Sequence, residues 1–389
     1  MDNPFKYGAV VADEKFVDRE KELAELELDL RSGQNVVIIS RRRYGKSSLI
    51  LQAVRHLRAQ GVLVAYLDLT ATPTIELLVD GLATALYSGL TGFRDRALHK
   101  VHDWFSKHSL RPTVTVTPEG ATTVELFAGD RTRNAEAVLR QVLGIPGQVA
   151  QDGKKVALVL DEFQEAVSID PHLPALIRSV WQLQSNVSHV FLGSKRHMMA
   201  RIFTDENQPM FRMGVPLPLG PIPATIFAGF IRDRFAATKQ PIADEAVDRI
   251  LQITECHPGD TQELCFFAWN LAATERLVAT AELVDRALVQ VIEAENTRYS
   301  ELWTRLSPHQ RLILTALVSG GGVSVYSEAY RRRHRLGPAS SVQRSLKALL
   351  ENDLVEETPA GDHRIPDAFL RPWLTRTMMA STTFYPPSD

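Results

Sequence analysis

The hydrophobic positions in the first half of the chain form short apolar runs separated by amphipathic stretches. Val36–Ile39 and Val156–Leu160 are continuous apolar runs, which predicts strands that are buried on both faces. Further strands are expected at Val62–Leu69, His189–Leu192 and Val215–Leu219. Because helical patterns separate these runs, the sequence predicts a parallel, doubly wound α/β sheet.

Two further features of the pattern mark the start of this region and an insertion in it. A helix is expected over about residues 19–31, with Asp18 as its cap and Gly33 at its end. Period-two alternation over about residues 111–127, around a turn at Pro118–Gly120, predicts a β-hairpin inserted before the third strand.

The second half of the chain has a helical pattern. Residues 224–300 predict helices only. Helices are then expected at Pro308–Leu317, Val325–His334 and Ser340–Glu351, followed by a small wing. Three helices and a wing predict a winged helix-turn-helix. The polar tail, Ser381–Asp389, is expected to fray.

A phosphate-binding loop is indicated between the first strand and the helix after it. The segment Ser40–Ser48 contains Gly45-Lys46-Ser47. In this context backbone N–H groups at a helix N-terminus hold the phosphates, Lys46 contacts the β- and γ-phosphates, and the Ser47 hydroxyl binds Mg²⁺. Ser40 stands where the consensus has a glycine, which is tolerable if its φ is negative. Because of this departure, a protein that binds nucleotide without hydrolysing it remains an alternative.

Two carboxylates end the strand Val156–Leu160. We expect Asp161 to hold Mg²⁺ through water, and Glu162 to orient and polarise the attacking water. The carboxyl ends of parallel strands share one edge, which places this pair beside Lys46. The alternative is two solvated acids that favour the dipole of a helix starting at Phe163. A glutamate in this position favours hydrolysis over kinase chemistry.

Polar residues also follow the fourth strand. Ser194 is the first candidate to sense the γ-phosphate, and Arg196 or Lys195 could neutralise developing charge; a basic strand-end turn is the alternative for each. His257, at a helix junction, is a candidate either for a nucleotide contact or for a structural cap. Arg212 is a weak candidate for an arginine finger, and an ordinary surface arginine is the favoured interpretation.

Together, these residues resemble the archaeal-type ATPases, a branch of the STAND and AAA+-like P-loop NTPases. The most specific match is the loop Arg42–Ser47, RRYGKS. The family often has proline at the position of Arg41 and threonine at that of Ser47. The other matching stretches, within residues 3–375, are Asn3–Gly8, Phe16–Glu20, Leu160–Gln164, Gly193–Ser194 and His257–Gly259.

The resemblance implies an α/β P-loop NTPase core of five parallel strands, in which other strands separate the acidic pair from the P-loop strand. It also implies an adenine pocket lined by Phe16–Glu20, a helical lid and a C-terminal winged helix. The corresponding domains are 1–222, 223–300 and 301–380. The residues expected to bind nucleotide are Phe16, Val17, Arg19, Arg42, Arg43, Tyr44, Gly45, Lys46, Ser47, Ser48 and His257.

Composition excludes several classes of protein. The 389 residues, 44% hydrophobic and 23% charged, indicate two to three folded domains rather than a disordered chain. A net charge of −2 excludes a basic nucleic-acid coat. We expect no signal peptide, and no apolar run in the sequence approaches the roughly 20 residues of a membrane span. Cys256 and Cys265 form no disulfide framework or CxxC motif, which favours a reducing cytoplasm.

Charge is uneven in the C-terminal region: residues 301–350 carry +6 and residues 351–375 carry −4. From the P-loop and the acidic pair we expect a Mg²⁺-dependent ATPase that acts as a nucleotide switch. Because basic side chains suit phosphate contacts, we expect this switch to associate with DNA. The acidic wing suits the alternative, a signalling or defence switch whose winged helix docks a protein partner or another copy of the chain. The residues expected to contact DNA are Arg331, Arg332, Arg333, Arg344 and Lys347.

Overall fold

The computed structural model describes residues 2–8, 19–90, 111–116, 122–127, 131–151 and 153–383, with backbone only for 111–134 and 379–383 within these ranges. The chain divides into two units. The sheet unit is Ala12–Gly220, and the helical unit joins Met1–Val11 to Pro221–Asp389. The predictions that lie outside the described residues concern Phe16, Val17, Asp18, the Pro118–Gly120 turn and residues 384–389 of the tail.

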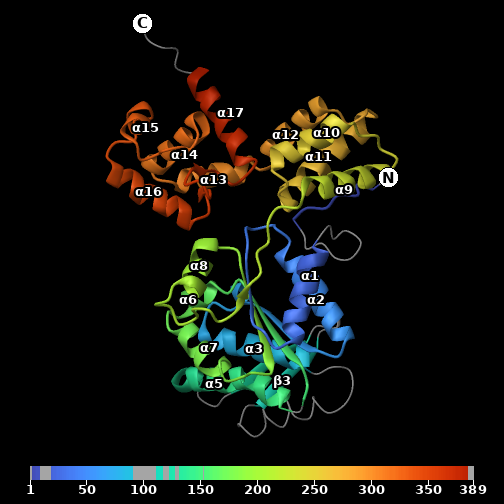
Figure 1. The fold of residues 1–389 in the computed structure, drawn as a ribbon, viewed down its shortest axis with the longest axis vertical. Coiled ribbons are helices and arrows are strands. Elements are labelled where there is room, and N and C mark those ends of the chain that lie inside the picture. Colours follow the sequence, from blue (N-terminus) through green and yellow to red (C-terminus); the bar gives the residue numbers. More distant parts are fainter. Residues whose placement is uncertain are drawn as a thin grey trace. The chain divides into compact units, whose positions relative to one another are not determined.

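A parallel five-stranded sheet forms the centre of the sheet unit (Figure 1). Its order is β2-β5-β6-β1-β7, so β6 separates the strand of the acidic pair, β5, from the P-loop strand, β1. This arrangement confirms the α/β class and the five-stranded core. The strands are β1 (Val36–Ile39), β2 (Leu63–Asp68), β5 (Val156–Asp161), β6 (Val187–Gly193) and β7 (Val215–Pro216).

Four strands differ from the predicted bounds: β2 is one residue shorter at each end, β5 is one residue longer, and β6 and β7 differ by more. β6 is longer than His189–Leu192, because the strand starts at Val187 beside β5. The edge strand β7 is shorter than Val215–Leu219, since Pro216 and Pro218 have no N–H with which to continue a ladder. Leu217, which has one, donates to the Val37 carbonyl at 2.9 Å.

Helices cover both faces of the sheet (Figure 1), because alternate strand residues point to opposite sides. Val36 and Ile38 pack with the first pair of helices, whereas Val37 packs in the cluster on the other face. The first pair is α1 (Glu20–Arg31) and α2 (Lys46–Ala59). The other face has η2 (Leu69–Ala71), α3 (Ile75–Leu90), α5 (Arg131–Ala150), α6 (Glu165–Ile169), α7 (Leu173–Trp181) and α8 (Arg196–Thr204).

The inserted hairpin is confirmed, as β3 (Arg111–Val116) pairs antiparallel with β4 (Thr122–Phe127). The start of α1 differs from the prediction. Its N-cap is Arg19, with φ 94° and no capping bond from the side chain. Gly33, with φ 80°, follows the last turn of α1, as predicted.

The first part of the helical unit is a run of helices, which confirms the pattern over residues 224–300. The N-terminal segment packs onto this part of the chain: Phe5 is buried with its ring against those of Phe230 and Phe235, and Asn3 Nδ2 donates to the Phe266 carbonyl at 2.9 Å. The helices are α9 (Ala224–Ala237), α10 (Asp244–Thr254), α11 (Pro258–Glu275), α12 (Ala281–Ala294) and α13 (Asn296–Arg305).

The winged helix follows, with two corrections to the prediction. The second helix starts at Glu328 rather than Val325, because the Ser327 side chain caps it by accepting from Tyr330 N. A last helix was not predicted, and it includes residues 381–383 of the tail that was expected to fray. The elements are α14 (Pro308–Gly320), α15 (Glu328–Arg333), α16 (Ala339–Glu351), β8 (Glu356–Glu357), β9 (His363–Arg364) and α17 (Leu370–Thr383).

Candidate active site

The predicted P-loop connects β1 to α2 at the carboxyl edge of the sheet, which we call the nucleotide edge. Gly45, with φ 85°, is the N-cap of α2, and the first turn of α2 carries no acidic residue. Ser40 is buried and is not one of the described residues with positive φ. The condition under which serine can replace the consensus glycine is therefore met.

The side chains of this loop differ in burial. Lys46 is 6% exposed, and its Nζ lies 3.5 Å from the Arg41 carbonyl oxygen. Tyr44 is buried, with the Arg41 guanidinium 5.7 Å from the centre of its ring. Arg42 and Arg43 are exposed, whereas Ser47 and Ser48 are half-buried in the first turn of α2.

Asp161 ends β5 and is only 4% exposed. Its Oδ1 accepts from Glu162 N at 2.9 Å, and its Oδ2 accepts from Ser47 Oγ at 3.3 Å and from the Tyr66 hydroxyl at 2.6 Å. Burial raises the pKa of Asp161, although the hydrogen bonds from Tyr66 and from Glu162 N act against this rise. The predicted metal ligands Ser47 and Asp161 are thus in contact.

Glu162 follows β5 in a left-handed conformation, with φ 50°. Its Oε2 accepts from Gln164 Nε2 at 2.5 Å and from Ser194 Oγ at 2.7 Å. Burial acts to raise the pKa of Glu162, but these two hydrogen bonds and the charge of Lys46 outweigh it and hold the pKa below its usual value. Glu162 is therefore a carboxylate at neutral pH, with its orientation set by two neighbours.

The residues after β6 have partners within the sheet unit. Ser194, predicted to sense the γ-phosphate, is buried, and its hydroxyl donates a hydrogen bond to Glu162. Lys195 Nζ lies 2.8 Å from Glu165 Oε1, and Arg196 is half-buried at the start of α8. The parallel register of β1, β5 and β6 thus brings Lys46 and Ser194 to the same edge as the acidic pair.

Sequence reasoning missed two residues at this edge. Gln164 lies within a stretch that matches the family, but it was given no role, although it holds Glu162. Tyr66 bonds Asp161, and the one available signal was a hydroxyl in the otherwise apolar start of β2.

The other predicted nucleotide contacts have structural partners of their own. Arg19 is buried and bonds Glu22 Oε1 at 2.7 Å and the Gly220 carbonyl. His257 belongs to the helical unit, where it is the N-cap of α11 and its Nδ1 accepts from Asp260 N at 3.1 Å. This contact is the capping arrangement that was one of the two expectations for His257.

Comparison with protein families shows which family the chain belongs to. A family model described as "ATPase domain predominantly from Archaea" matches residues 16–264, which is more than half of the chain. The chain belongs to this ATPase family. It therefore binds ATP and hydrolyses it. A second model, "Probable winged helix domain", matches residues 297–376. The resemblance to the archaeal-type ATPases is confirmed.

Solved structures show the same fold for the archaeal-type ATPase. The chain is similar to the Walker-type ATPase PABY2304 of Pyrococcus abyssi, with 18% identity, a TM-score of 0.67, and coverage of 96% of this chain and 99% of that one. It is also similar to the ORC2 protein of Aeropyrum pernix in its ADPNP-ADP complexes, with 16% identity, a TM-score of 0.55, and coverage of 97% and 99%. A comparison with curated proteins finds no match.

The predicted DNA contacts of this ATPase lie on α15 and α16, and they differ in how they are held. Arg331 donates from Nε to the Tyr326 carbonyl at 3.0 Å and from its terminal nitrogen to the Gly337 carbonyl at 3.0 Å, so it braces the turn between the two helices. The remaining side chains are exposed, and we call them the basic face. They are Arg332, Arg333, Arg344 and Lys347.

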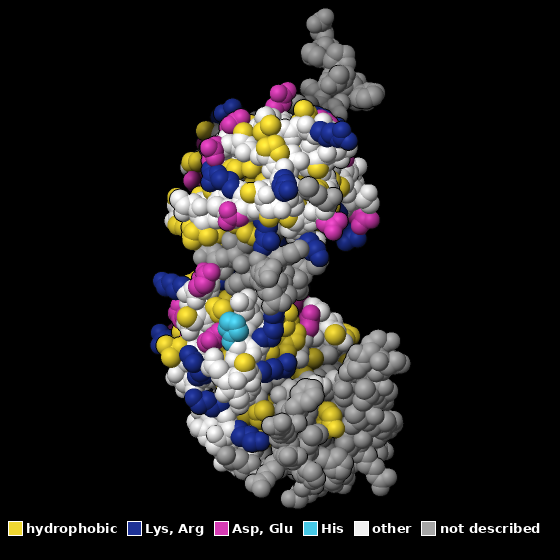
Figure 2. Space-filling model, turned by 90° about the vertical axis from the view of Figure 1, so that its right-hand side faces the viewer, with side chains coloured by type: hydrophobic (Ala, Val, Ile, Leu, Met, Phe, Trp, Pro, Cys, Tyr) yellow, Lys and Arg dark blue, Asp and Glu magenta, His cyan; other side chains and the backbone are white. Residues whose placement is uncertain are grey.

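The surface of the ATPase carries both signs of charge. In the upper unit of Figure 2, which is the helical unit, Lys and Arg side chains are interspersed with Asp and Glu. Among the described residues, no three His, Cys, Asp or Glu side chains group as metal ligands. Within the same residues, we find no helix with the length and apolar character of a transmembrane span.

Proposed function

We propose that this ATPase is a Mg²⁺-dependent nucleotide switch that associates with duplex DNA through its winged helix. The observation that carries the proposal is the contact network of the nucleotide edge. There the Ser47 hydroxyl lies 3.3 Å from Asp161, and Glu162 is held by Ser194 and Gln164. These groups are the parts that phosphoryl transfer to water requires.

The donor set of this edge suits Mg²⁺. Proteins hold this ion through one or two oxygen ligands, with water and substrate phosphates completing its octahedron. Ser47 supplies a hydroxyl and Asp161 a carboxylate, and the two groups lie 3.3 Å apart. Mg²⁺ needs no further protein ligands, because water and phosphates supply the rest. Mg²⁺ bound there would neutralise charge on the phosphates.

Each side chain of the edge then has one task. Lys46 supplies a buried positive charge for the β- and γ-phosphates. Glu162, ionised and held in place, accepts a hydrogen bond from the attacking water and receives its proton. Ser194 and Gln164 keep the carboxylate of Glu162 in one orientation, so that it does not have to reorient before reaction.

A charged cluster in the helical unit supports the switch. Glu255, at the C-cap of α10 and two residues before His257, accepts from Arg364 of β9 at 2.6 Å and from Arg371 of α17 at 2.5 Å. Arg364 also bonds the buried Glu356 of β8 at 2.6 Å. The proposed lid, residues 223–300, is therefore ionically tied to the wing, so that a rotation of one would move the other.

The basic face supports contact with DNA. Arg332 pairs only with Glu328 of its own helix at 2.6 Å, and Lys347 with Glu351 at 3.9 Å, among the ion pairs of the described residues. Such exposed pairs are worth little, so both cations can exchange their partners for phosphates. The acidic wing favours a second candidate, in which the same face docks an acidic protein surface.

One experiment separates these functions. ATP hydrolysis is measured with Mg²⁺ or with EDTA, and duplex binding is measured over a salt series. We expect hydrolysis to require Mg²⁺ and duplex affinity to fall steeply with salt. Hydrolysis at the full rate in EDTA would contradict the metal assignment, whereas no duplex affinity at low salt would favour the protein-docking switch.

A further inference from the structure

We infer that Tyr66 is a positioning residue that fixes the Asp161 carboxylate for Mg²⁺, an inference that rests on the proposed metal dependence. Tyr66 lies on β2, whose parallel pairing with β5 sets Tyr66 opposite Val159 and Asp68 opposite Asp161. The side chain of Tyr66 packs with the cluster on the α1 and α2 face. Its hydroxyl is 2.6 Å from Asp161 Oδ2.

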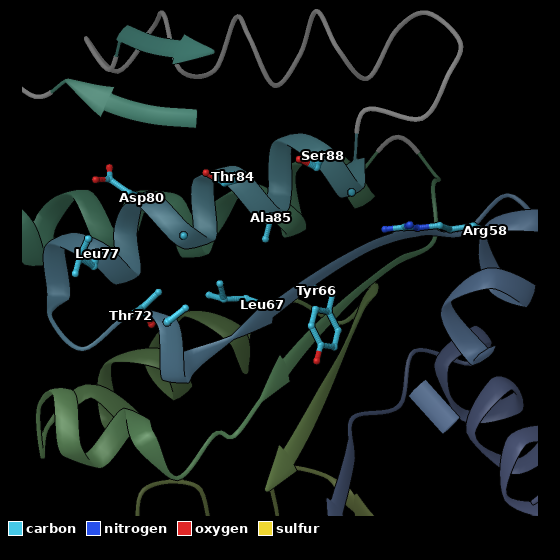
Figure 3. Close-up of a pocket in the computed structure, with 12 residues that line it drawn as sticks. Arg58, Tyr66, Leu67, Thr72, Leu77, Asp80, Thr84, Ala85 and Ser88 are labelled. Atoms are coloured by element: carbon cyan, nitrogen blue, oxygen red, sulfur yellow. The ribbon is translucent and has the colours of Figure 1, made fainter. Parts of the chain in front are cut away.

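The position of Tyr66 at the edge of the sheet shows what its hydroxyl contacts. The residue lines a cavity of about 490 Å³ between β2 and α3, and Figure 3 shows its hydroxyl directed away from α3. Among the described residues, Asp161 is the one hydrogen-bond partner of the Tyr66 hydroxyl.

The bonds of Asp161 show why the Tyr66 contact matters for a metal. Ser47 Oγ approaches the same Oδ2 at 3.3 Å, a longer and weaker contact, and its hydroxyl is the group proposed to turn to Mg²⁺. The bonds from Tyr66 and Glu162 N then remain, one on each oxygen of the carboxylate. Outer partners of this kind orient metal-binding carboxylates, and their loss typically costs about 10- to 100-fold in metal affinity.

The test is Tyr66→Phe, which keeps the ring and removes the donor. ATP binding is followed by a fluorescent ATP analogue, with Mg²⁺ titrated from an EDTA-treated start. We expect the Mg²⁺ concentration at half-maximal tightening to rise about 10-fold, with analogue affinity in EDTA unchanged. The Mg²⁺ concentration for half-maximal hydrolysis should rise by the same factor.

The chain offers a matched control in the helical unit. The Tyr299 hydroxyl lies 2.7 Å from Asp367 Oδ1, so Tyr299→Phe removes the same kind of bond from a buried ring. This control should lose thermal stability while it keeps the wild-type Mg²⁺ midpoint. The expected result is a shifted midpoint in Tyr66→Phe alone.

Three results would overturn the inference. A wild-type Mg²⁺ midpoint in Tyr66→Phe would show that the hydroxyl does not position Asp161. An equal loss of analogue affinity in EDTA and in Mg²⁺ would show a purely structural role. A wild-type protein that binds the analogue equally with and without Mg²⁺ would remove the proposed metal dependence itself, and the inference with it.

Discussion

The nucleotide edge and the basic face both concentrate charge, but the protein holds that charge in opposite ways. At the edge, Asp161 and Lys46 are nearly inaccessible, and Asp161 accepts hydrogen bonds from three groups. On the basic face, the Arg332 and Lys347 side chains are 79% and 76% exposed and pair with acids one turn away.

The difference in burial has a consequence for how each region responds to substitution. A buried charge must be paired and oriented by the fold, so the loss of a single partner is costly. An exposed ion pair contributes about 0 to 1 kcal/mol, and its members change partner easily. We therefore expect single substitutions to have large effects at the edge and small, additive effects on the basic face.

The largest effect is expected for Lys46→Ala, which should abolish tight ATP binding. The substitution removes the buried cation that we propose contacts the β- and γ-phosphates. Calorimetry with ATP measures the loss. Lys155→Ala is the matched control, because Lys155 is an exposed lysine just before β5, at the end of that strand opposite Asp161. Wild-type ATP affinity in Lys46→Ala would refute the P-loop assignment.

A smaller effect is expected from His189, a buried histidine of β6. Burial lowers its pKa from 6.5 to about 3; its Nδ1 lies 3.1 Å from Asn35 Oδ1, and its ring stacks on Trp181. Below pH 6.5 the unfolded chain takes up a proton at His189, whereas the folded chain does not. The contribution of this histidine to the free energy of unfolding is therefore complete above pH 6.5 and decreases as the pH falls toward 3. At pH 5 the loss is about 2 kcal/mol relative to pH 7.

Urea unfolding at several pH values measures this loss. His189→Phe keeps an aromatic ring against Trp181 but cannot titrate, so its free energy of unfolding should fall less between pH 7 and 5. A variant with the wild-type pH dependence would show that another group is responsible.

The smallest effect per residue is expected on the basic face. Replacing Arg332, Arg333 and Arg344 together by alanine should lower the salt slope of duplex binding by about three units, one for each lost phosphate contact. Loss of affinity should be similar for all sequences, because phosphates carry no sequence information. ATP hydrolysis without DNA should be unchanged, since the three residues lie outside the sheet unit.

The control for this prediction is a second triple variant. It replaces three arginines that are ion-paired on the other helices of the helical unit, Arg232, Arg249 and Arg286. We expect it to bind duplex like the wild type. An equal loss in both triple variants would show a diffuse effect of net charge rather than a defined face.

The sequence was most informative where one physical demand dominates. Buried strands such as Val156–Asp161 need continuous apolar residues, and the P-loop needs glycine at Gly45, so both could be predicted. Contacts between segments distant in sequence could not. Nothing local indicates that Tyr66 bonds Asp161 95 residues later, or that the Ser194 hydroxyl turns to Glu162.

Boundaries were also hard to predict where tertiary contacts set them. The last helix, α17, has a weak apolar pattern, yet buried Trp373 and Leu374 anchor it, with Trp373 Nε1 donating to Asn296 at 2.9 Å. Arg331 looked like its basic neighbours in the sequence. Only the fold shows that its guanidinium bonds two carbonyls.

The most direct test of the central claim is single-turnover hydrolysis of labelled ATP by Glu162→Gln. Glutamine preserves the size of the side chain but cannot accept the proton of water, so ATP should bind with Mg²⁺ and persist while turnover falls by roughly 100-fold or more. Glu165→Gln is the control, three residues away and paired with Lys195 at 2.8 Å, and it should hydrolyse ATP normally. Unchanged turnover in Glu162→Gln would contradict the account, because water activation would then lie elsewhere.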